Sequence, residues 1–569
     1  MFLFDTHRSV AQRLRLSADS ALGAGNYFWR VCRTVDDLDT PLLFHRRPGP
    51  DGELRGHSLG VLRARVVAYA DWYSAHGVGV SSRVGVLTAD GLRGFLHHIA
   101  VTAIGAVTVP VNPNMAPGTA AAYFRRTGTR VLVGDAELIA VGSEMTLVAT
   151  LDEIDVQAPP STATVPRSPH RHGPDDLILI SHSSGTTGTP KPTLFTHQGF
   201  FVGKRERLWN FPSRRSDRLL TALPHSHSAG LSYLGLAVML GLPTLLTDDR
   251  SGAGVASAMN GFRPTVVIGF PLSLAELPVD RLSAEARQEV HTWMGMGDAS
   301  HERHIRPLVR LGRRQERGQW LPGSVYVDGL GSSEMGMVLF KNTHTARTSH
   351  YGRMIGKPVP VVREAVVLDA DGNRLAAGEA GLLGVRTPSV TPGYWDDPEL
   401  TAKAHRGDYF LTGDVVRRDE DGNFYHLDRT PDVIATADGP VYSLPLEEVV
   451  LNASDALDAA VVAVDDPAHP TASRPVAVLL FQDSAPASAE ELLARCNKEL
   501  GAAGLAPLHA LLVAADRDEL PVGVTGKVLK RVLRERHRSL LGEQARPGLA
   551  FALGPRRPVS PSEGHLHDR

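Results

Sequence analysis

The sequence is poor in cysteine, in net charge and in long apolar runs, and each shortage argues against a class of protein. Only Cys32 and Cys496 occur among 569 residues, far apart and without partners at metal-ligand spacing. A disulfide scaffold or a cysteine-based zinc site is therefore not expected. Sixty basic residues against 62 acidic ones leave a formal charge of -2, which gives no sign of a nucleic-acid footprint.

No stretch reaches the roughly 18 consecutive apolar residues that read as a membrane span. The first residues, "MFLFDTHRSVAQRLRL", carry Asp5 and His7 early and lack the apolar core of a signal peptide. We therefore expect a cytoplasmic protein without a membrane span.

The length indicates at least two domains, because 569 residues exceed what one hydrophobic core usually holds. Residues 60–135 alternate helical and strand patterns with short connections, which predicts α/β units with parallel strands. The same alternation returns at "PTVVIGF" and "SVYVDGLG". From about residue 360 the pattern changes to hairpins with Asp-Gly turns, and a small α+β region follows.

We therefore predict an α/β protein with a large N-terminal domain of layered α/β subdomains and a β-rich segment. The expected boundaries are residues 1–428 for this core, 429–431 for a hinge and 432–540 for a small, mobile α+β lid. The segment 541–569 is rich in proline and glycine, and we expect a disordered tail there.

The stretch "SHSSGTTGTPKP", residues 181–192, directly follows an apolar strand at 177–180. A glycine-rich loop at a strand end can present backbone N–H groups to an anion. A hydroxyl-rich surface linker is the alternative. A Walker loop does not fit, since it needs Gly-Lys followed by Ser or Thr, whereas Lys191 lies between two prolines. Gly526-Lys527 fails the same test because Val528 follows it.

The loop resembles the phosphate loop of the adenylate-forming superfamily, which includes acyl-CoA synthetases, adenylation domains and luciferases. Further motifs of that superfamily follow in its order over about residues 60–535: "LPHSHSAG", "MGMGDAS", "DGLGSSEMG", "YGRMIGKPVP", the segment from "LTGD" to "HLDR", and "LPVGVTGKVLKRVLRE". We identify the chain as a divergent member of this superfamily.

The resemblance implies a role for individual residues. The ATP phosphates would be held by Ser183, Ser184, Gly185, Thr186, Thr187, Gly188 and Lys191, with Thr187 also counted as catalytic. The turn Gly297, Asp298, Ala299 and the segment Leu330, Gly331, Ser332 would meet adenine, and Ser333 the α-phosphate. Asp414 and Arg429 would bind the ribose, with Arg429 also in reach of the phosphates.

Three further residues would carry the chemistry. Glu334 would bind Mg²⁺, because a hard cation prefers carboxylate oxygen. Lys527 corresponds to the catalytic lysine, where a cation stabilises the charge that develops during transfer. His227 would lie at the mouth of the acid pocket and gate or position the substrate, while His225 is interpreted as structural. The basic residues Lys530, Arg531 and Arg534 are interpreted as a solvated helix face.

Several positions depart from the pattern of the superfamily. His182 stands where an aromatic residue is common, Pro192 replaces a glycine, and Leu330 replaces the aromatic residue that stacks on adenine. Pro431 occupies the hinge position, with its φ angle locked, and the loop that normally lines the CoA tunnel is altered at Asp438. Adenylation is therefore better supported than the use of CoA.

We predict an ATP- and Mg²⁺-dependent AMP-forming ligase that activates a small acid and releases pyrophosphate. A CoA thioester would follow if the chain is an acid–CoA ligase. Alternatively, the activated group passes to an amine or a carrier-protein thiol, including a diazotase-like reaction in which nitrite is activated and an aryl amine attacks. A degenerate, non-enzymatic ATP-binding protein is the third hypothesis. The acid pocket is expected near Trp209, His227, Phe270 and residues 294–297.

Overall fold

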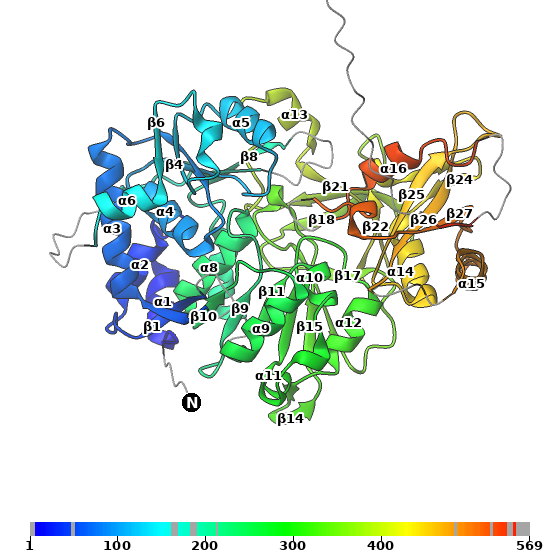
Figure 1. The fold of residues 1–569 in the computed structure, drawn as a ribbon, viewed down its shortest axis with the longest axis horizontal. Helices are drawn as coiled ribbons and strands as arrows, with labels where there is room; N and C mark the ends of the chain where they lie inside the picture. The colour runs from blue at the N-terminus through cyan, green and yellow to red at the C-terminus, as the bar shows by residue number, and fades with distance from the viewer. Residues whose placement is uncertain are drawn as a thin grey trace, which may run out of the picture. The chain divides into compact units, whose positions relative to one another are not determined.

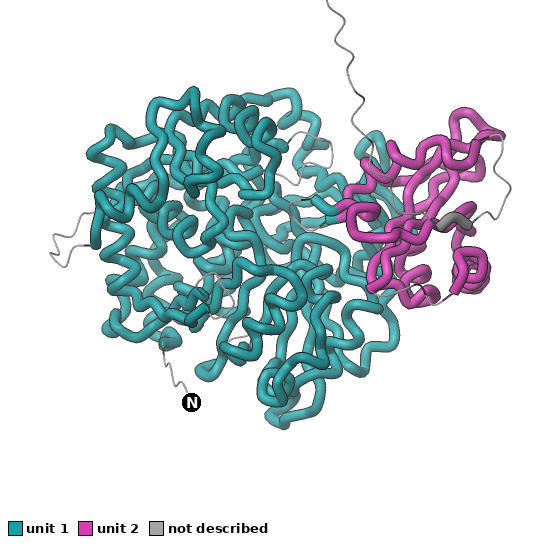
Figure 2. The backbone as a smooth tube through the Cα atoms, in the orientation of Figure 1, with its two compact units in different colours: residues 1–431, 522–527 teal, residues 432–521, 528–569 magenta. Residues whose placement is uncertain are grey.

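A computed structural model describes residues 6–46, 52–160, 169–182, 190–211, 214–482, 485, 487–523, 527–542 and 550–552. The chain forms two compact units, coloured separately in Figure 2. The first comprises residues 1–431 together with 522–527, and the second comprises residues 432–521 and 528–569.

A six-stranded sheet in the first unit carries the glycine-rich segment. Its order is β6 (Leu147–Thr150), β5 (Val131–Gly134), β3 (Arg83–Leu87), β4 (Val107–Pro110), β7 (Leu177–His182) and β8 (Pro192–Thr196). All neighbours pair in parallel except β7 and β8, which form an antiparallel pair on either side of residues 183–191. The glycine-rich stretch is thus the connection of a β-hairpin.

Helices surround this sheet because each has an apolar face to bury. They are α3 (Leu59–Ala75), α4 (Gly91–Ala103), α5 (Pro117–Arg126) and α6 (Leu151–Gln157), drawn in blue and cyan in Figure 1. Asp90 caps α4 by accepting a hydrogen bond from the Arg93 N–H at 2.9 Å. Most side chains of α4 are buried, including His97 and His98.

The second sheet of this unit has fourteen strands and two halves. Its parallel half contains β1 (Pro41–Arg46), β10 (Thr244–Leu246), β9 (Leu219–Thr221), β11 (Val266–Gly269), β12 (Thr292–Gly295) and β15 (Val325–Asp328), and β2 (Leu54–Ser58) pairs antiparallel at the edge. The antiparallel half continues from β15 through β16 (Phe340–Thr345), β17 (Met354–Pro358), β22 (Phe424–Arg429), β21 (Tyr409–Arg418), β19 (Ala380–Arg386) and β18 (Glu364–Leu368), with β20 (His405–Arg406) beside β21. The predicted change from parallel units to hairpins is confirmed.

The remaining helices of this unit are α1 (Val10–Ala18), α2 (Tyr27–Thr34), α7 (Val202–Asn210), α8 (Ser228–Leu240), α9 (Gly252–Phe262), α10 (Pro271–Ala275), α11 (Ala284–Glu289), α12 (Glu302–Val309) and α13 (Pro398–Lys403), and β13 (Arg313–Glu316) and β14 (Gln319–Pro322) form a separate hairpin. Helix α8 is buried on nearly all sides, as an all-round apolar helix must be. Helices α9 to α12 lie along the parallel half of the large sheet (Figure 1).

The second unit is a small α+β structure. It contains the hairpin β23 (Ile434–Thr436) and β24 (Gly439–Val441), the helices α14 (Ser443–Ser454), α15 (Ala489–Ala502) and α16 (Lys530–His537), and a sheet of β25 (Asp458–Asp465), β26 (Ser473–Leu480), β27 (Ala510–Val513) and β28 (Ala550–Ala552). The α/β class, with a large unit and a small α+β unit, is confirmed.

Two expectations about this unit are wrong in part. Residues 550–552 lie in the segment expected to be disordered, yet they extend the sheet by pairing in parallel with β27. Helix α16 is not simply a solvated basic face. Its Lys530 Nζ lies 2.7 Å from Glu447 Oε1, where both side chains are largely buried, and Arg534 pairs with Asp432. These charges point inward because each meets a carboxylate of its own unit. No helix in the described part of the chain is long and apolar enough to cross a membrane.

Candidate active site

A pocket of about 1080 Å³, partly open to solvent, lies in the first unit and brings together many of the predicted site residues. Those that line it are Lys191, His227, Gly297, Gly331, Ser332, Ser333, Glu334, Arg429 and Lys527. They come from the start of β8, the start of α8, the turn after β12, the segment after β15, the end of β22 and the segment 522–527. Residues that are distant in sequence therefore share one wall because several strand ends meet there.

His227 is the N-cap residue of helix α8, and its two ring nitrogens have separate partners. Nδ1 accepts a hydrogen bond from the Ala229 N–H at 3.2 Å, and Nε2 lies 3.1 Å from Ser333 Oγ. Burial, together with the charges of His182 and Lys527, lowers the pKa of His227 to about 3. The ring is therefore neutral near pH 7, with its proton on Nε2 facing the Ser333 hydroxyl. In this geometry His227 orients Ser333 and is a poor general base.

Glu334 lies in the short 3₁₀ turn η3 (Ser333–Met335), which follows β15. The Tyr394 hydroxyl donates a hydrogen bond to Glu334 Oε1 at 3.3 Å, and Lys191 Nζ lies 5.7 Å from the centre of the Tyr394 ring. A carboxylate that lines a pocket beside groups predicted to bind phosphate fits the preference of Mg²⁺ for one or two carboxylates plus phosphate oxygens. Tyr394 was not predicted, since nothing in its spacing links it to Glu334.

Asp414 and Arg429 form an ion pair between β21 and β22, in which Asp414 is buried and Arg429 is half-buried. Arg429 Nε lies 3.1 Å from Asp414 Oδ1, and His426 Nε2 lies 3.4 Å from the same oxygen. Burial alone would raise the pKa of Asp414, but the Arg429 charge and the nearby His426 ring hold it well below its usual range. Asp414 is therefore an anion that positions Arg429 in the pocket wall.

Lys527 lines the pocket, and its carbonyl accepts a hydrogen bond from the Gly523 N–H at 2.7 Å. Burial lowers the pKa of Lys527, whereas Asp298, Asp414 and Glu334 act in the opposite direction and Arg429 adds to the lowering. Lys527 therefore interacts with Asp298, Asp414, Glu334 and Arg429, which the sequence predicts to share one site with it.

Other predicted residues do not line the pocket. Leu330 packs against the cluster around Met335, Leu339 and Phe340, because its backbone pairs with Leu339. Asp298 is exposed, with its carboxylate turned back to the Ala299 N–H. Ala299 and Asp414 are also absent from the lining. Ser183, Ser184, Gly185, Thr186, Thr187 and Gly188 lie outside the described residues.

The expected acid pocket is correct in part. His227, Phe270, Met296 and Gly297 line it, but Trp209 is 45% exposed and donates a hydrogen bond from Nε1 to Ser17 Oγ. Met294 is buried in the main hydrophobic core instead. The apolar wall also contains Tyr233, Leu236, Met337 and Val338, and two basic residues of α7, Lys204 and Arg207, line the same pocket. His225 is buried beside Asp248 and is absent from this lining.

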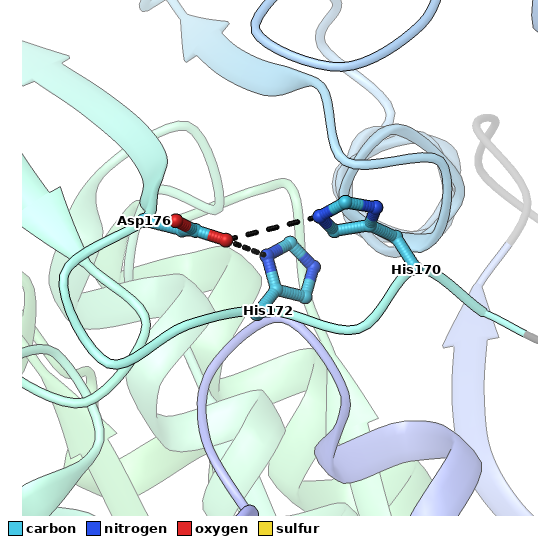
Figure 3. A group of neighbouring side chains, drawn as sticks. All are labelled: His170, His172 and Asp176. Atoms are coloured by element: carbon cyan, nitrogen blue, oxygen red, sulfur yellow. Dashed lines mark ion pairs between the residues drawn. The ribbon is translucent and has the colours of Figure 1, made fainter.

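Two clusters of metal-ligand type occur among the described residues, and both lie outside this pocket. In the first, His170 Nε2 and His172 Nδ1 each lie 3.8 Å from the same Asp176 oxygen (Figure 3). The second is His45, Asp90 and Asp248, in which His45 Nε2 lies 2.7 Å from Asp248 Oδ2. Both therefore stand apart from the candidate active site.

The family model described as "AMP-binding enzyme" matches residues 47–395. The chain belongs to the AMP-binding enzyme family. The predicted superfamily and the predicted class, an adenylate-forming, AMP-forming ligase, are thereby confirmed.

Named relatives of this AMP-binding enzyme fall into two groups. It is 39% identical to a 3-aminoavenalumate diazotase of Streptomyces sp, over 93% of this chain and 98% of the relative. It is 26% identical to a 3-hydroxybenzoate–CoA ligase of Aromatoleum sp. (strain CIB), over 86% and 93% of the two chains. The fold matches the crystal structure of ATP-bound MatB from Rhodopseudomonas palustris with a TM-score of 0.75 at 22% identity, covering 91% of this chain and all of the other.

Proposed function

We propose that this AMP-binding enzyme is a CoA-independent diazotase, which activates nitrite with ATP and passes the nitroso group to an aryl amine. The observation that carries the proposal is the 39% identity to a diazotase along nearly the whole of both chains. The sequence agrees, because the departures at Pro431 and Asp438 fall at the hinge and in the loop expected to serve CoA.

In the first step, a nitrite oxygen attacks the α-phosphorus of ATP and pyrophosphate leaves, which gives a mixed anhydride of nitrite and AMP. Lys527 and Arg429 place two positive charges in the pocket where negative charge develops on the phosphate. Ser333 offers a hydroxyl that His227 orients, and Lys191 adds a cation. Glu334 would hold Mg²⁺, which supplies charge neutralisation when bound.

The predicted roles of the glycine-rich segment extend this step. Ser183 to Gly188 would add N–H and hydroxyl donors to the β- and γ-phosphates, with Thr187 closest to the chemistry. Gly297, Gly331 and Ser332 would contact the adenosine part, and Asp414 would bind the ribose while it positions Arg429.

In the second step, the amine nitrogen attacks the nitroso nitrogen, the N–O bond to AMP breaks, and AMP leaves with that oxygen. The resulting nitrosamine takes up a proton and loses water to give the aryl diazonium ion, so no oxidant or reductant is required. The apolar wall of Phe270, Tyr233 and Met296 suits an aromatic ring, which buries its faces against apolar and aromatic side chains.

The test is product analysis with purified protein and ATP. With nitrite and an aminoaryl substrate, we expect AMP, pyrophosphate and a diazonium product that couples to naphthol, unchanged by CoA. The second candidate, an acid–CoA ligase like the 26% identical relative, instead predicts a thioester that needs CoA and no nitrite. Thioester formation without any nitrite-dependent product would refute the diazotase proposal and leave the ligase.

The predicted lid and hinge also remain proposals. We propose that residues 432–540 act as a lid that turns about 429–431 during the reaction, and that a locked φ at Pro431 narrows the range of that motion. Protease protection of the 429–431 segment by ATP and nitrite tests this, and equal cleavage in all states would contradict it.

A further inference from the structure

Helix α7 presents two basic side chains to the pocket. Lys204 and Arg207 are three residues apart, so they lie on one face of the helix. Both line the pocket, and Lys204 is only 6% exposed. A buried lysine is rare unless it is paired, and it therefore calls for an explanation.

The partners of these two cations in the described part of the chain are neutral. Lys204 Nζ donates a hydrogen bond to the Phe200 carbonyl and lies 3.4 Å from the centre of the Phe200 ring. Arg207 donates to the Tyr233 hydroxyl at 3.1 Å and to the Val338 carbonyl at 3.4 Å. Among described residues, no carboxylate forms an ion pair with either. Two neighbouring cations without a counter-ion are costly in a pocket wall.

A third polar group of the same pocket is also left over. The hydroxyl of Ser232, on helix α8, is 8% exposed, and its oxygen has no hydrogen-bond partner among the described residues. Helices α7 and α8 pack against each other. Buried polar groups are nearly always satisfied, so this hydroxyl and the two cations together indicate a missing anionic acceptor.

Lys204, Arg207 and Ser232 form a group that is distinct from the residues predicted to bind ATP. The charged residues that act on Lys527 include Asp298, Arg429, Asp414 and Glu334, whereas the charge that acts on Lys204 is that of Arg207. The direct contacts of Lys204 and Arg207 are with Phe200, Tyr233 and Val338.

We propose that the aryl amine substrate carries a carboxylate, and that Arg207 and Lys204 bind this carboxylate while the amine faces the nucleotide. The inference rests on the proposed diazotase function. If a carboxylate were the group that is activated, it would have to face the ATP phosphates and Lys527. A carboxylate that takes no part in the reaction needs counter-charges of its own, and α7 supplies them.

The experiment compares neutral and charged substrates of equal size. Aminobenzoate, aminophenylacetate and aminophenylpropanoate, each paired with its carboxamide, are assayed with ATP and nitrite for diazonium formation. At the best length, we expect kcat/KM of the carboxylate to exceed that of the carboxamide by about 10- to 100-fold, as charged hydrogen bonds allow. Arg207→Gln should bring that ratio close to one through a raised KM, with the KM for nitrite unchanged.

The control is Arg33→Gln, which removes the same charge from an exposed position on α2. It should leave the preference for the carboxylate intact. Equal use of carboxylates and carboxamides by the wild-type protein would overturn the inference, and so would a loss in Arg207→Gln that is equal for both.

The same design separates this inference from the proposed function. Diazotisation of carboxamides and carboxylates alike would leave the diazotase proposal standing and remove the carboxylate site. If no aryl amine is diazotised, the function fails, and calorimetry without ATP or nitrite then tests the site alone. Binding of an aminoaryl carboxylate that Arg207→Gln weakens at least about tenfold would support the site, and binding unaffected by that change would refute it.

Discussion

At the scale of residues, the pocket contains two lysines whose charge is disfavoured by burial but whose surroundings differ. Lys527 has Asp298, Asp414 and Glu334 in its electrostatic neighbourhood, so its charge is partly compensated. Lys204 has Arg207 instead, and its pKa lies well below its usual range because of burial and that second cation. The partly compensated charge of Lys527 suits catalysis, whereas a bound anion would supply the counter-charge that Lys204 and Arg207 lack among the described residues.

Lys527→Ala is expected to abolish adenylation, with a loss of kcat of at least about 100-fold, because a fixed cation at the transferring phosphate is removed. The overall fold should be retained, since Lys527 forms no ion pair with a described residue. Pyrophosphate release and circular dichroism of the variant check both statements. Unchanged turnover would refute the catalytic role.

Lys204→Met should stabilise the free protein by about 1–2 kcal/mol, because it replaces a buried amine that has no carboxylate partner among the described residues with an apolar side chain of similar length. The sign follows from the lowered pKa: the unfolded chain binds the proton of Lys204 more tightly than the folded chain does at neutral pH. Denaturant unfolding measures the gain. A variant less stable than wild type would show that the amine is satisfied in the folded state.

At the scale of elements, helix α7 explains why the sequence could predict one half of the pocket and not the other. The residues predicted to bind the nucleotide stand in motifs with fixed order, so they could be named in advance. The α7 segment "VGKRERLWN" has its lysine buried and its tryptophan 45% exposed, the reverse of what hydrophobicity suggests. Lys204, Arg207 and Tyr394 were missed because their roles depend on contacts between distant segments.

The large sheet shows the same division. The hairpin of β21 and β22 was predicted from its Asp-Gly turn, since turn chemistry is local. In the second unit, the ion pairs of α16 were not predicted from the sequence. The partners of Lys530 and Arg534 in these pairs, Glu447 and Asp432, lie far away in the sequence. Leu330 was placed against adenine by its motif position, whereas its packing against Phe340 is decided by the sheet.

Gly203→Ala tests the shape of the pocket at α7. An added Cβ would overlap the Met337 sulfur, which lines the pocket, so the methionine must move. We expect a KM for the aryl amine raised about tenfold, with little change in the KM for ATP. Gly501→Ala, in helix α15 with open space around its Cβ, is the matched control and should leave both values unchanged. An unaltered KM in Gly203→Ala would place the substrate elsewhere.

At the scale of the whole molecule, buried histidines in the first unit couple its stability to pH. Burial lowers the pKa of His97 to about 3 and the pKa values of His98 and His197 to about 4. The unfolded chain binds these protons near pH 6.5, and the folded chain only near pH 3–4. Stability is therefore fully present above about pH 6.5 and falls as the pH drops toward 4.

Between pH 6.5 and 5.5, each of these histidines should cost about 1 kcal/mol of unfolding free energy, because the unfolded histidine is already half protonated at pH 6.5. Urea unfolding at the two pH values measures the total loss, and His97→Gln should reduce it by about 1 kcal/mol. His350→Gln, at an exposed position, is the control and should leave the slope unchanged. A stability independent of pH in this range would contradict the burial of these rings.

Nitrite labelled with oxygen-18 shows whether nitrite itself is the acid that ATP activates. If a nitrite oxygen attacks the α-phosphate and the N–O bond breaks later, the AMP released with an aryl amine must carry one heavy oxygen from nitrite. Mass spectrometry of the AMP should therefore show that label in every turnover. Unlabelled AMP formed together with the product would contradict activation of nitrite and the account of the pocket that depends on it.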